Sequence, residues 1–299
     1  MYAISVFNNK GGVGKSTLTL FMADFLATLS VRGRALRVLV MDMDAQGSSA
    51  AALLGTDGLE RARGSGLGVG RLARDLDLRT AVDTGEFLFK RPRGVPKGRA
   101  EPLPEIGVMV SDKASSFAFE VNPLHRLTIL RDGLKPELAK RFDVAILDLP
   151  GNIDERNLLA VNALIMSDAV VAPVEPSRIS INALPDTLEM VRYVRARGAR
   201  EAPVFLGLVL NRVDKRSQQF QRNLPWIRQM CEQLGVPLFD AVLPNAMALS
   251  TATDDRLACD AMRERYGLYY PHVKAVVWEV FRRWRHRQGG EGGEAIGEP

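Results

Sequence analysis

Cysteine is scarce in this chain of 299 residues, which contains Cys231 and Cys259 and no others. Two cysteines so far apart form neither a CxxC pair nor a disulfide framework, and this usage is typical of a reducing compartment. No apolar run reaches about 18 residues, so no transmembrane helix is expected. No basic segment followed by an apolar one precedes the first expected strand, so no signal peptide is expected either. These absences predict a cytoplasmic protein.

Composition and charge leave a wide range of functions open. The chain is 46% hydrophobic and 25% charged, which is enough for one large domain with a deep core or for two small domains. The net charge of +5 and the pI of about 9.3 favour polyanionic partners, although many ordinary proteins share this mild basic excess. We predict a single domain over residues 1–288, with a variable, mobile insertion at 55–105 and a disordered tail at 289–299 that is rich in Gly and Glu.

A glycine-rich loop near the N-terminus carries the clearest chemical signal. Residues 10–17 read KGGVGKST, follow the apolar run 2–7 and precede an apolar helical pattern over 18–29. A strand, a glycine loop and a helix in this order are typical of a phosphate-binding loop, because glycine lets backbone N–H groups close around phosphate oxygens. The residues expected to bind the phosphates are Gly11, Gly12, Val13, Gly14, Lys15, Ser16 and Thr17.

Two positions of this loop need separate comment. Lys15 would reach the β- and γ-phosphates, and the Ser16 hydroxyl would bind Mg²⁺. The strict pattern GxxxxGK[ST] fails at its first position, where the chain has Asn9 followed by a second lysine, Lys10. A purely structural glycine loop is the alternative interpretation, and it is the weaker one because both the spacing and the context match a phosphate loop.

Acidic residues follow two further apolar runs, which we expect to be buried parallel strands. Asp42 and Asp44 follow the run at 38–41, and Asp148 follows another in a Walker B pattern. Ligands of doubly wound sheets bind at the carboxyl ends of the strands, so we expect these carboxylates near the phosphate loop. Asp148 would bind Mg²⁺ through water and accept a hydrogen bond from Ser16. Alternatively, Asp42 and Asp44 only cap the strand end and the next helix.

The loop string KGGVGKST resembles the deviant Walker A motif of the ParA/MinD family of ATPases. The resemblance implies that Lys10 crosses the interface of an ATP-sandwiched dimer and contacts the nucleotide of the partner subunit. The string DMDAQG resembles switch I of the family, with Ala45 in place of the usual proline. It implies that Asp44 orients the attacking water and that Asp42 helps to hold the water shell of the magnesium ion. The string DLPG resembles switch II, which implies a backbone N–H of Gly151 near the γ-phosphate.

Two other segments resemble the parts of the family that surround the base. An asparagine at the end of the strand equivalent to 204–210 reads the adenine edge in the MinD branch, so the resemblance makes Asn211 the candidate for base recognition. Its amide donor and acceptor suit that edge, and a simple turn asparagine is the alternative. Pro244 and Asn245 lie in a segment similar to the one whose backbone cradles the base. The likeness covers nearly the whole chain and, with the strand pattern, predicts a doubly wound, mostly parallel α/β sheet flanked by helices.

Basic residues form a group of candidates for binding DNA. In ParA-like proteins, basic residues after the strand equivalent to 204–210 and near the C-terminus bind DNA without reading its sequence. The residues that this resemblance makes candidates for salt-sensitive phosphate contacts are Lys215, Arg216, Arg282 and Arg283. The segment 90–99 is also basic and contains no acidic residue, so we interpret it as a surface loop. It either contacts DNA or an acidic partner, or is only solvated.

Other segments carry expectations about the fold. Helical spacing over 124–141 and 224–234 predicts helical structure in both segments, and Pro136 either breaks the first or starts a second turn in it. The apolar run 238–243 predicts a strand. The final helix is expected to begin near Pro271 and to carry one apolar stripe. The stripe consists of Val273, Val276, Val277, Val280, Phe281 and Trp284. It favours packing against the core, and a membrane-surface helix like that of MinD is the alternative.

Together these features predict a switch ATPase that uses ATP and Mg²⁺. A ParA-like protein would form a homodimer with ATP, bind nonspecific nucleoid DNA and be released when a ParB-like adaptor stimulates hydrolysis. A MinD-like regulator at the membrane surface is the alternative. A cluster carrier like the nitrogenase iron protein is nearly excluded, because neither Cys231 nor Cys259 follows a recognised strand end.

Overall fold

The computed structural model describes residues 1–31, 33–122, 124–254 and 259–287. Its main sheet has seven strands in the order β5-β6-β4-β7-β1-β8-β9. In chain order they are β1 Tyr2–Val6, β4 Val38–Asp42, β5 Phe89–Arg91, β6 Ile106–Val110, β7 Val144–Asp148, β8 Ala169–Val174 and β9 Val204–Leu210. Among these described strands, β5 alone runs antiparallel to its neighbour. The prediction of a mostly parallel, doubly wound sheet is therefore confirmed.

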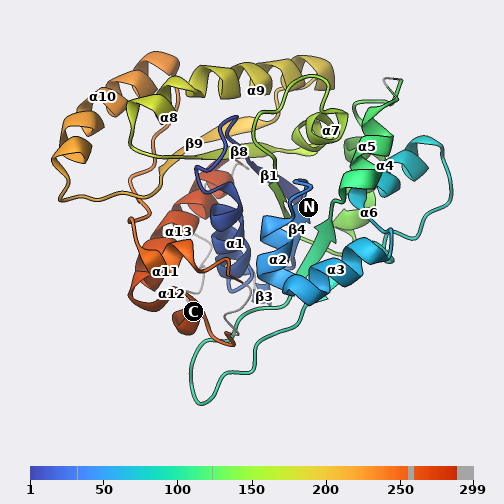
Figure 1. The fold of residues 1–299 in the computed structure, drawn as a ribbon, viewed down its shortest axis with the longest axis horizontal. Helices are drawn as coiled ribbons and strands as arrows, with labels where there is room; N and C mark the ends of the chain where they lie inside the picture. Colours follow the sequence, from blue (N-terminus) through green and yellow to red (C-terminus); the bar gives the residue numbers. More distant parts are fainter. Residues whose placement is uncertain (32, 123, 255–258, 288–299) are drawn as a thin grey trace.

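Helices cover both faces of the sheet because the strand residues alternate between two apolar layers (Figure 1). In β7, Val144 and Ile146 belong to one layer, while Ala145 and Leu147 belong to the other. The first layer contains α1 Lys15–Leu26, α2 Ser48–Leu54, α3 Thr56–Gly64, α11 Met247–Ser250, α12 Met262–Tyr266 and α13 Tyr270–Arg287. The second contains α4 Val69–Asp77, α5 Lys113–Glu120, the π-helix η1 Leu130–Leu134, α6 Lys135–Ala139, α7 Leu158–Met166, α8 Arg178–Asn182, α9 Leu184–Gly198 and α10 Gln218–Leu234.

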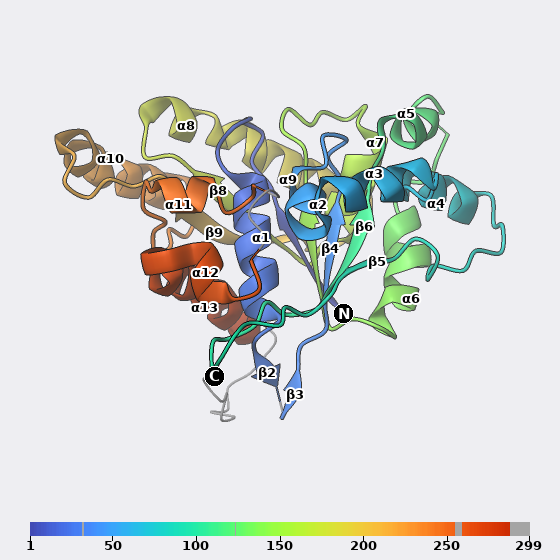
Figure 2. The same ribbon diagram turned by 60° about the horizontal axis from the view of Figure 1, so that its bottom comes forward.

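Parallel strands bring their carboxyl ends to one edge of the sheet, and the loop between β1 and α1 lies at this edge. A small hairpin of β2 Ser30–Val31 and β3 Arg34–Ala35 follows α1. Figure 2 shows the start of α1 near α8 and this hairpin at the opposite end of the molecule. The topology therefore places the predicted phosphate loop away from the hairpin.

Residues 55–105 contain more regular structure than we predicted, because α3, α4 and β5 fall within them. The prediction of a surface loop over 90–99 was wrong at its start. Arg91 ends β5, which pairs with β6, and its side chain is buried. Further along, the Leu103 N–H donates to the Asp260 carbonyl (2.9 Å), which ties this region to the segment before α12.

Two predicted helices have different bounds in the structure. Over 124–141, helical structure begins only at Leu130, as η1 followed by α6, and Leu124 is 87% exposed. Leu124 is therefore not part of the apolar helical face to which its spacing assigned it. The helix predicted at 224–234 begins earlier, at Gln218, and contains Pro225 in its interior.

The strand predicted at 238–243 is not formed, although residues near both of its ends still donate to backbone carbonyls of β9. Between those ends, the N–H groups of Asp240 and Ala241 donate to the carboxylate of Glu279 in α13, at 3.2 and 3.0 Å. Because a side chain accepts from these two donors, the backbone leaves the sheet at this point.

The final helix packs against the core, as predicted. Its six apolar stripe residues are all buried. Within the described ranges, no helix is both long and apolar enough to cross a membrane. The tail predicted at 289–299 lies outside the described residues.

Candidate nucleotide-binding site

The loop between β1 and α1 presents the start of a helix at the carboxyl edge of the sheet. α1 begins at Lys15, and Gly14 precedes it in the left-handed conformation with φ of 94°. A Cβ atom at position 14 would lie 2.2 Å from the Asn211 Nδ2 atom, so a side chain there would force Asn211 to move. The first N–H groups of α1 have no partners within the helix, and the helix dipole is positive at this end. This geometry suits a bound phosphate.

Lys15 lies against the loop itself. Its Nζ atom donates to the Lys10 carbonyl at 2.9 Å, and the side chain is buried. Burial lowers the pKa of Lys15, while the nearby charges of Asp148 and Asp44 act in the opposite direction. A phosphate could replace the single carbonyl acceptor and would stabilise the ammonium ion more strongly.

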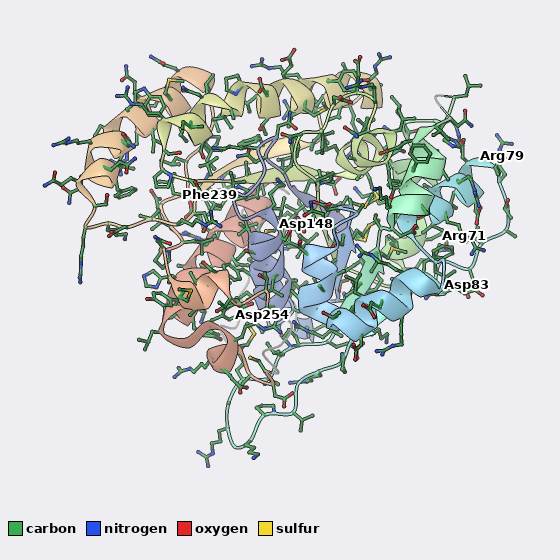
Figure 3. All side chains as sticks on the ribbon, viewed as in Figure 1. Arg71, Arg79, Asp83, Asp148, Phe239 and Asp254 are labelled. Atoms are coloured by element: carbon green, nitrogen blue, oxygen red, sulfur yellow. The ribbon has the colours of Figure 1, made fainter. Side chains whose placement is uncertain are left out.

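Asp42 and Asp148 face each other across neighbouring strands, since they are register partners in β4 and β7. Both side chains are buried, and Figure 3 shows Asp148 in the middle of the molecule beside α1. The Asp42 carboxylate accepts from the N–H groups of Asp44 (3.1 Å) and Ala50 (2.8 Å). Burial raises the pKa of Asp42 to about 6 in spite of these hydrogen bonds.

Asp148 differs from Asp42 in its hydrogen bonds. Neither of its carboxylate oxygens has a hydrogen-bond partner within the described part of the chain. Burial and the Asp42 charge together raise its pKa to about 7, although the nearby hydroxyls of Ser16 and Ser49 and the Lys15 charge act in the opposite direction. Two buried carboxylates are therefore held together beside Lys15 at the end of the phosphate loop.

These residues fit a magnesium ion. Among the described residues there is no cluster of three or more His, Cys, Asp or Glu side chains that would hold a metal by itself. Mg²⁺ does not need one, because it keeps several waters and binds through one or two carboxylates together with substrate phosphates. The unpartnered oxygens of Asp148, with Ser16 and Asp42 beside them, are such a set.

The loop after β7 lies directly against the phosphate loop. A Cβ atom at Gly151 would be 3.2 Å from both the Gly11 nitrogen and the Lys15 Nζ atom, so position 151 is confined by the loop. Asn9 joins the two loops, since its carbonyl accepts from the Asn152 N–H at 3.1 Å. Its side-chain oxygen accepts from the Ile153 N–H at 2.6 Å. Nothing in the loop pattern indicated this function of Asn9, although Asn9 occupies the position where the strict motif has glycine.

Lys10 and Asp44 both have contacts within their own chain. The Lys10 Nζ atom donates to the Ser180 hydroxyl in α8 at 3.0 Å, and nothing in the sequence pattern indicated Ser180. The half-buried Asp44 accepts from the Gln46 N–H at 2.9 Å, so it caps the turn after β4, while α2 itself begins after Gly47 without a side-chain cap. A cap and a water-orienting carboxylate are compatible, and the catalytic function of Asp44 stays a prediction.

Asn211 lies beneath the phosphate loop. Its Nδ2 atom donates to the Val13 carbonyl at 2.9 Å, and its Oδ1 atom accepts from the Arg212 N–H. Pro244 and Asn245 lie nearby, because both pair with Val213, two residues after Asn211. The structure thus brings the three predicted base-binding residues to one side of the loop, while their contact with a base stays a prediction.

The four candidate DNA-binding residues differ in their surroundings. Lys215, Arg216 and Arg282 are exposed. Arg283 instead donates to the Leu206 and Leu238 carbonyls, at 2.9 and 2.8 Å, and to Glu279 at 2.6 Å. Its guanidinium group also lies 4.1 Å above the ring of Phe239, which is labelled in Figure 3. These contacts occupy Arg283 within the fold, so we withdraw it from the candidate DNA surface.

Replacing Gly14 with alanine is expected to lower the free energy of unfolding by about 2–3 kcal/mol, because the left-handed backbone becomes strained and Asn211 must move. Gly11→Ala is the matched control, since a Cβ atom there meets nothing within 4 Å. We expect it to change stability by no more than about 0.5 kcal/mol. Chemical denaturation without nucleotide measures both variants. Equal losses would contradict the packing of Asn211 against the loop.

Comparison with known proteins agrees with this site. Residues 4–257 match the model of the CobQ/CobB/MinD/ParA nucleotide binding domain. The chromosome partitioning protein ParA of Caulobacter vibrioides is 26% identical over 253 residues, which cover 83% of this chain and 82% of that protein.

Two solved structures have the same fold. The structure of pNOB8 ParA bound to nonspecific DNA has a TM-score of 0.68 at 20% identity, and the match covers 95% of this chain and 99% of that one. The structure of cobyrinic acid a,c-diamide synthase from Mycobacterium smegmatis with bound ADP and magnesium has a TM-score of 0.63 at 18% identity. That match covers 100% of this chain and 99% of the synthase chain.

The fold and the loop define a P-loop nucleotide-binding protein. The family match covers most of the chain, and the chain belongs to the CobQ/CobB/MinD/ParA family. The resemblance to ParA/MinD ATPases that the loop string indicated is therefore confirmed.

Proposed function

We propose that this chain is an ATP-hydrolysing switch that forms a homodimer with ATP and binds nonspecific DNA in that state. A ParB-like partner would stimulate hydrolysis and so release it, in the partitioning of DNA or the positioning of a cargo on the nucleoid. The observation that carries this proposal is the buried, unpartnered carboxylate of Asp148 beside Asp42 and Lys15. The similarity to a chromosome partitioning protein, and to the fold of a ParA bound to nonspecific DNA, supports the DNA-binding part.

The residues of the phosphate loop would neutralise the nucleotide. Lys15 would leave the Lys10 carbonyl for the β- and γ-phosphates, and the backbone N–H groups at the start of α1 would bind their oxygens. Ser16 and Asp148, with Asp42 beside them, would hold Mg²⁺. When bound, this ion would neutralise charge that develops on the phosphates.

Hydrolysis would need a positioned water and a second subunit. Asp44 would orient the water for in-line attack, and the N–H of Gly151, which lies against Lys15, would face the γ-phosphate. Lys10 would act on the nucleotide of the second subunit. Because a switch needs a long-lived ATP state, we expect slow turnover by the isolated protein and faster turnover with its partner.

Binding of the base and of DNA involves other surfaces. Asn211, Pro244 and Asn245 would contact the adenine. The exposed residues Lys215, Arg216 and Arg282 would contact DNA phosphates. A membrane-surface function of the last helix has less support, because its apolar stripe is buried in the core.

Sedimentation with nonspecific duplex DNA tests the proposal. It is measured with ATP, with ADP and without nucleotide, at about 50 and 200 mM salt. We expect binding that requires ATP, persists in Asp44→Ala because hydrolysis is blocked, disappears in Lys10→Ala because the dimer is lost, and weakens at least about tenfold at the higher salt.

Two results would count against the proposal. If the protein forms an ATP-dependent dimer that binds no DNA in any nucleotide state, the DNA-binding function is wrong, and liposome binding becomes the next measurement. If Lys10→Ala binds DNA like the wild type, Lys10 does not act across a dimer.

A further inference from the structure

Both lysines of the phosphate loop are bound to acceptors of their own chain. Lys15 donates from Nζ to the Lys10 carbonyl (2.9 Å), and Lys10 donates from Nζ to the Ser180 hydroxyl (3.0 Å). Ser180 is fully buried in α8, and its N–H is capped by the Ser177 hydroxyl at 3.3 Å. The contact of Lys10 therefore leads to an ordered, buried hydroxyl group and not to a mobile surface side chain.

Lys10 takes part in both contacts, once through its carbonyl and once through its side chain. Lys10 accepts from Lys15 with its carbonyl, while its own side chain is held by Ser180. When a phosphate attracts Lys15, the Lys10 carbonyl loses this donor. The Lys10 carbonyl then lacks this restraint, while the Lys10 N–H still donates to the Asn8 Oδ1 atom at 3.0 Å. We expect the carbonyl side of the residue to turn about this remaining contact and to change the direction of the side chain away from α8.

α8 carries an exposed residue next to the group that binds Lys10. Ile179, which precedes Ser180, is 74% exposed, while Lys10 is half-buried. A lysine that bridges to α8 of its own chain is not available to another subunit. The contact with Ser180 therefore competes with any contact that Lys10 makes across an interface.

We propose that Ser180 is a positioning residue that holds Lys10 against its own subunit until nucleotide binding withdraws Lys15 from the Lys10 carbonyl. This inference rests on the proposed function, in which Lys10 acts across a homodimer. The contact with Ser180 would explain why the dimer needs nucleotide. Until nucleotide binds, Lys10, which must cross the interface, is held within its own chain.

Chemical labelling of lysine tests the contact without reference to activity. The full chain without nucleotide is treated with an acetylating reagent, and mass spectrometry compares the labelling rate of Lys10 with those of the exposed Lys97 and Lys113 in the same sample. Loss of one hydrogen bond to a charged group should raise the Lys10 rate about three- to tenfold in Ser180→Ala. ADP with Mg²⁺ should raise it in the wild type by a similar factor.

Two matched variants separate the hydroxyl contact from the stability of α8. Ser180→Thr keeps a hydroxyl group and should label like the wild type. Ser177→Ala removes the cap of α8 but not the acceptor of Lys10, so it should also stay within about twofold. Sedimentation velocity over a range of ATP concentrations then measures dimer formation. Ser180→Ala should reach half-dimerisation at about three- to tenfold less ATP than the wild type.

Three results would overturn the inference. Equal Lys10 labelling in Ser180→Ala and the wild type would show that the hydroxyl does not hold the lysine. Unchanged labelling when ADP is added would show that Lys15 and Lys10 are not coupled. Faster labelling with an unchanged ATP dependence of a real dimer would show that the contact does not control assembly. If even the wild type forms no dimer with ATP, the proposed function itself fails, while the labelling result still decides whether Ser180 holds Lys10.

Discussion

Arg91→Leu is expected to lower the free energy of unfolding by about 3–5 kcal/mol, because it leaves a buried carboxylate without its main partner. Asp24 is fully buried in α1, and its Oδ1 atom lies 2.5 Å from the Arg91 Nη2 atom. The Arg91 side chain is also buried, and its guanidinium group donates to the Pro104 carbonyl at 2.9 Å. The pair joins the helix that carries the phosphate loop to the edge strand β5.

Two other groups contact Asp24 but cannot replace Arg91. Arg265 lies 3.5 Å away, and the Tyr266 hydroxyl donates to the carboxylate. Burial raises the pKa of Tyr266 well above its usual value, so this hydroxyl stays protonated and supplies no charge. Without Arg91, the charged partner that the described residues leave to this fully buried carboxylate is Arg265, at the longer distance of 3.5 Å.

The neighbouring residue provides the control. Lys90 pairs with Glu105 at 3.1 Å, but these side chains are 69% and 58% exposed. Lys90→Leu should therefore change stability by about 0–1 kcal/mol. Arg91→Lys should be intermediate, because it keeps the charge but loses the planar fork. Urea denaturation of the three variants measures these differences. If Arg91→Leu and Lys90→Leu behaved alike, the buried ion pair would not contribute as we infer.

Asp148→Asn is expected to stabilise the nucleotide-free protein at pH 8 while it weakens binding of Mg²⁺ with ATP. Burial raises the pKa of Asp148 to about 7 and that of Asp42 to about 6, both above the usual value of 3.8. The folded state therefore binds more protons than the unfolded state between about pH 4 and 7, and its stability falls as the pH rises through this window. The neutral amide removes one of the two repelling charges.

The size of the effect on the free energy of unfolding depends on how far relaxation relieves the burial of the ionised carboxylate. We expect a gain on the order of 2 kcal/mol at pH 8. The gain should nearly vanish at pH 4, where the wild-type carboxyl group is protonated. Thermal unfolding of the wild type and of Asp148→Asn from pH 4 to 8 measures this gain. At pH 8 we expect the Tm of Asp148→Asn to be several degrees higher than that of the wild type.

A second aspartate provides a control with the opposite sign. Asp143 precedes β7 at the other edge of the sheet, and hydrogen bonds from Arg37 and Arg34 hold its pKa well below its usual range although partial burial acts against them. Asp143→Asn should therefore lower the Tm at pH 7, where Asp148→Asn raises it. Adding Mg²⁺ with ATP should raise the Tm of the wild type and of Asp143→Asn, and that of Asp148→Asn much less. A destabilising effect of Asp148→Asn at pH 8 would contradict the strain that we infer between Asp42 and Asp148.

Short-range patterns determined most of the nucleotide site. Residues 10–17 combine glycines, a lysine and a hydroxyl at set offsets between a strand and a helix, so their chemistry could be inferred without any tertiary contact. Asp42 and Asp148 could be placed because each ends an apolar run, and parallel strands present their ends at one edge. The apolar stripe of α13 could be assigned to the core for the same kind of reason, since its period matches one face of a helix.

The tertiary structure decided which charged groups are free and which are bound. Arg91 and Arg93 look alike in a basic segment, yet Arg91 is buried against Asp24 and Arg93 is exposed. Arg283 looks like a surface residue of a basic helix, but carbonyls of the sheet edge bind it. Lys10 donates a hydrogen bond to Ser180, which lies 170 residues further along the sequence. A residue type and its spacing report local geometry, whereas the partner of a charged side chain comes from a distant segment that only the folded chain brings within hydrogen-bonding distance.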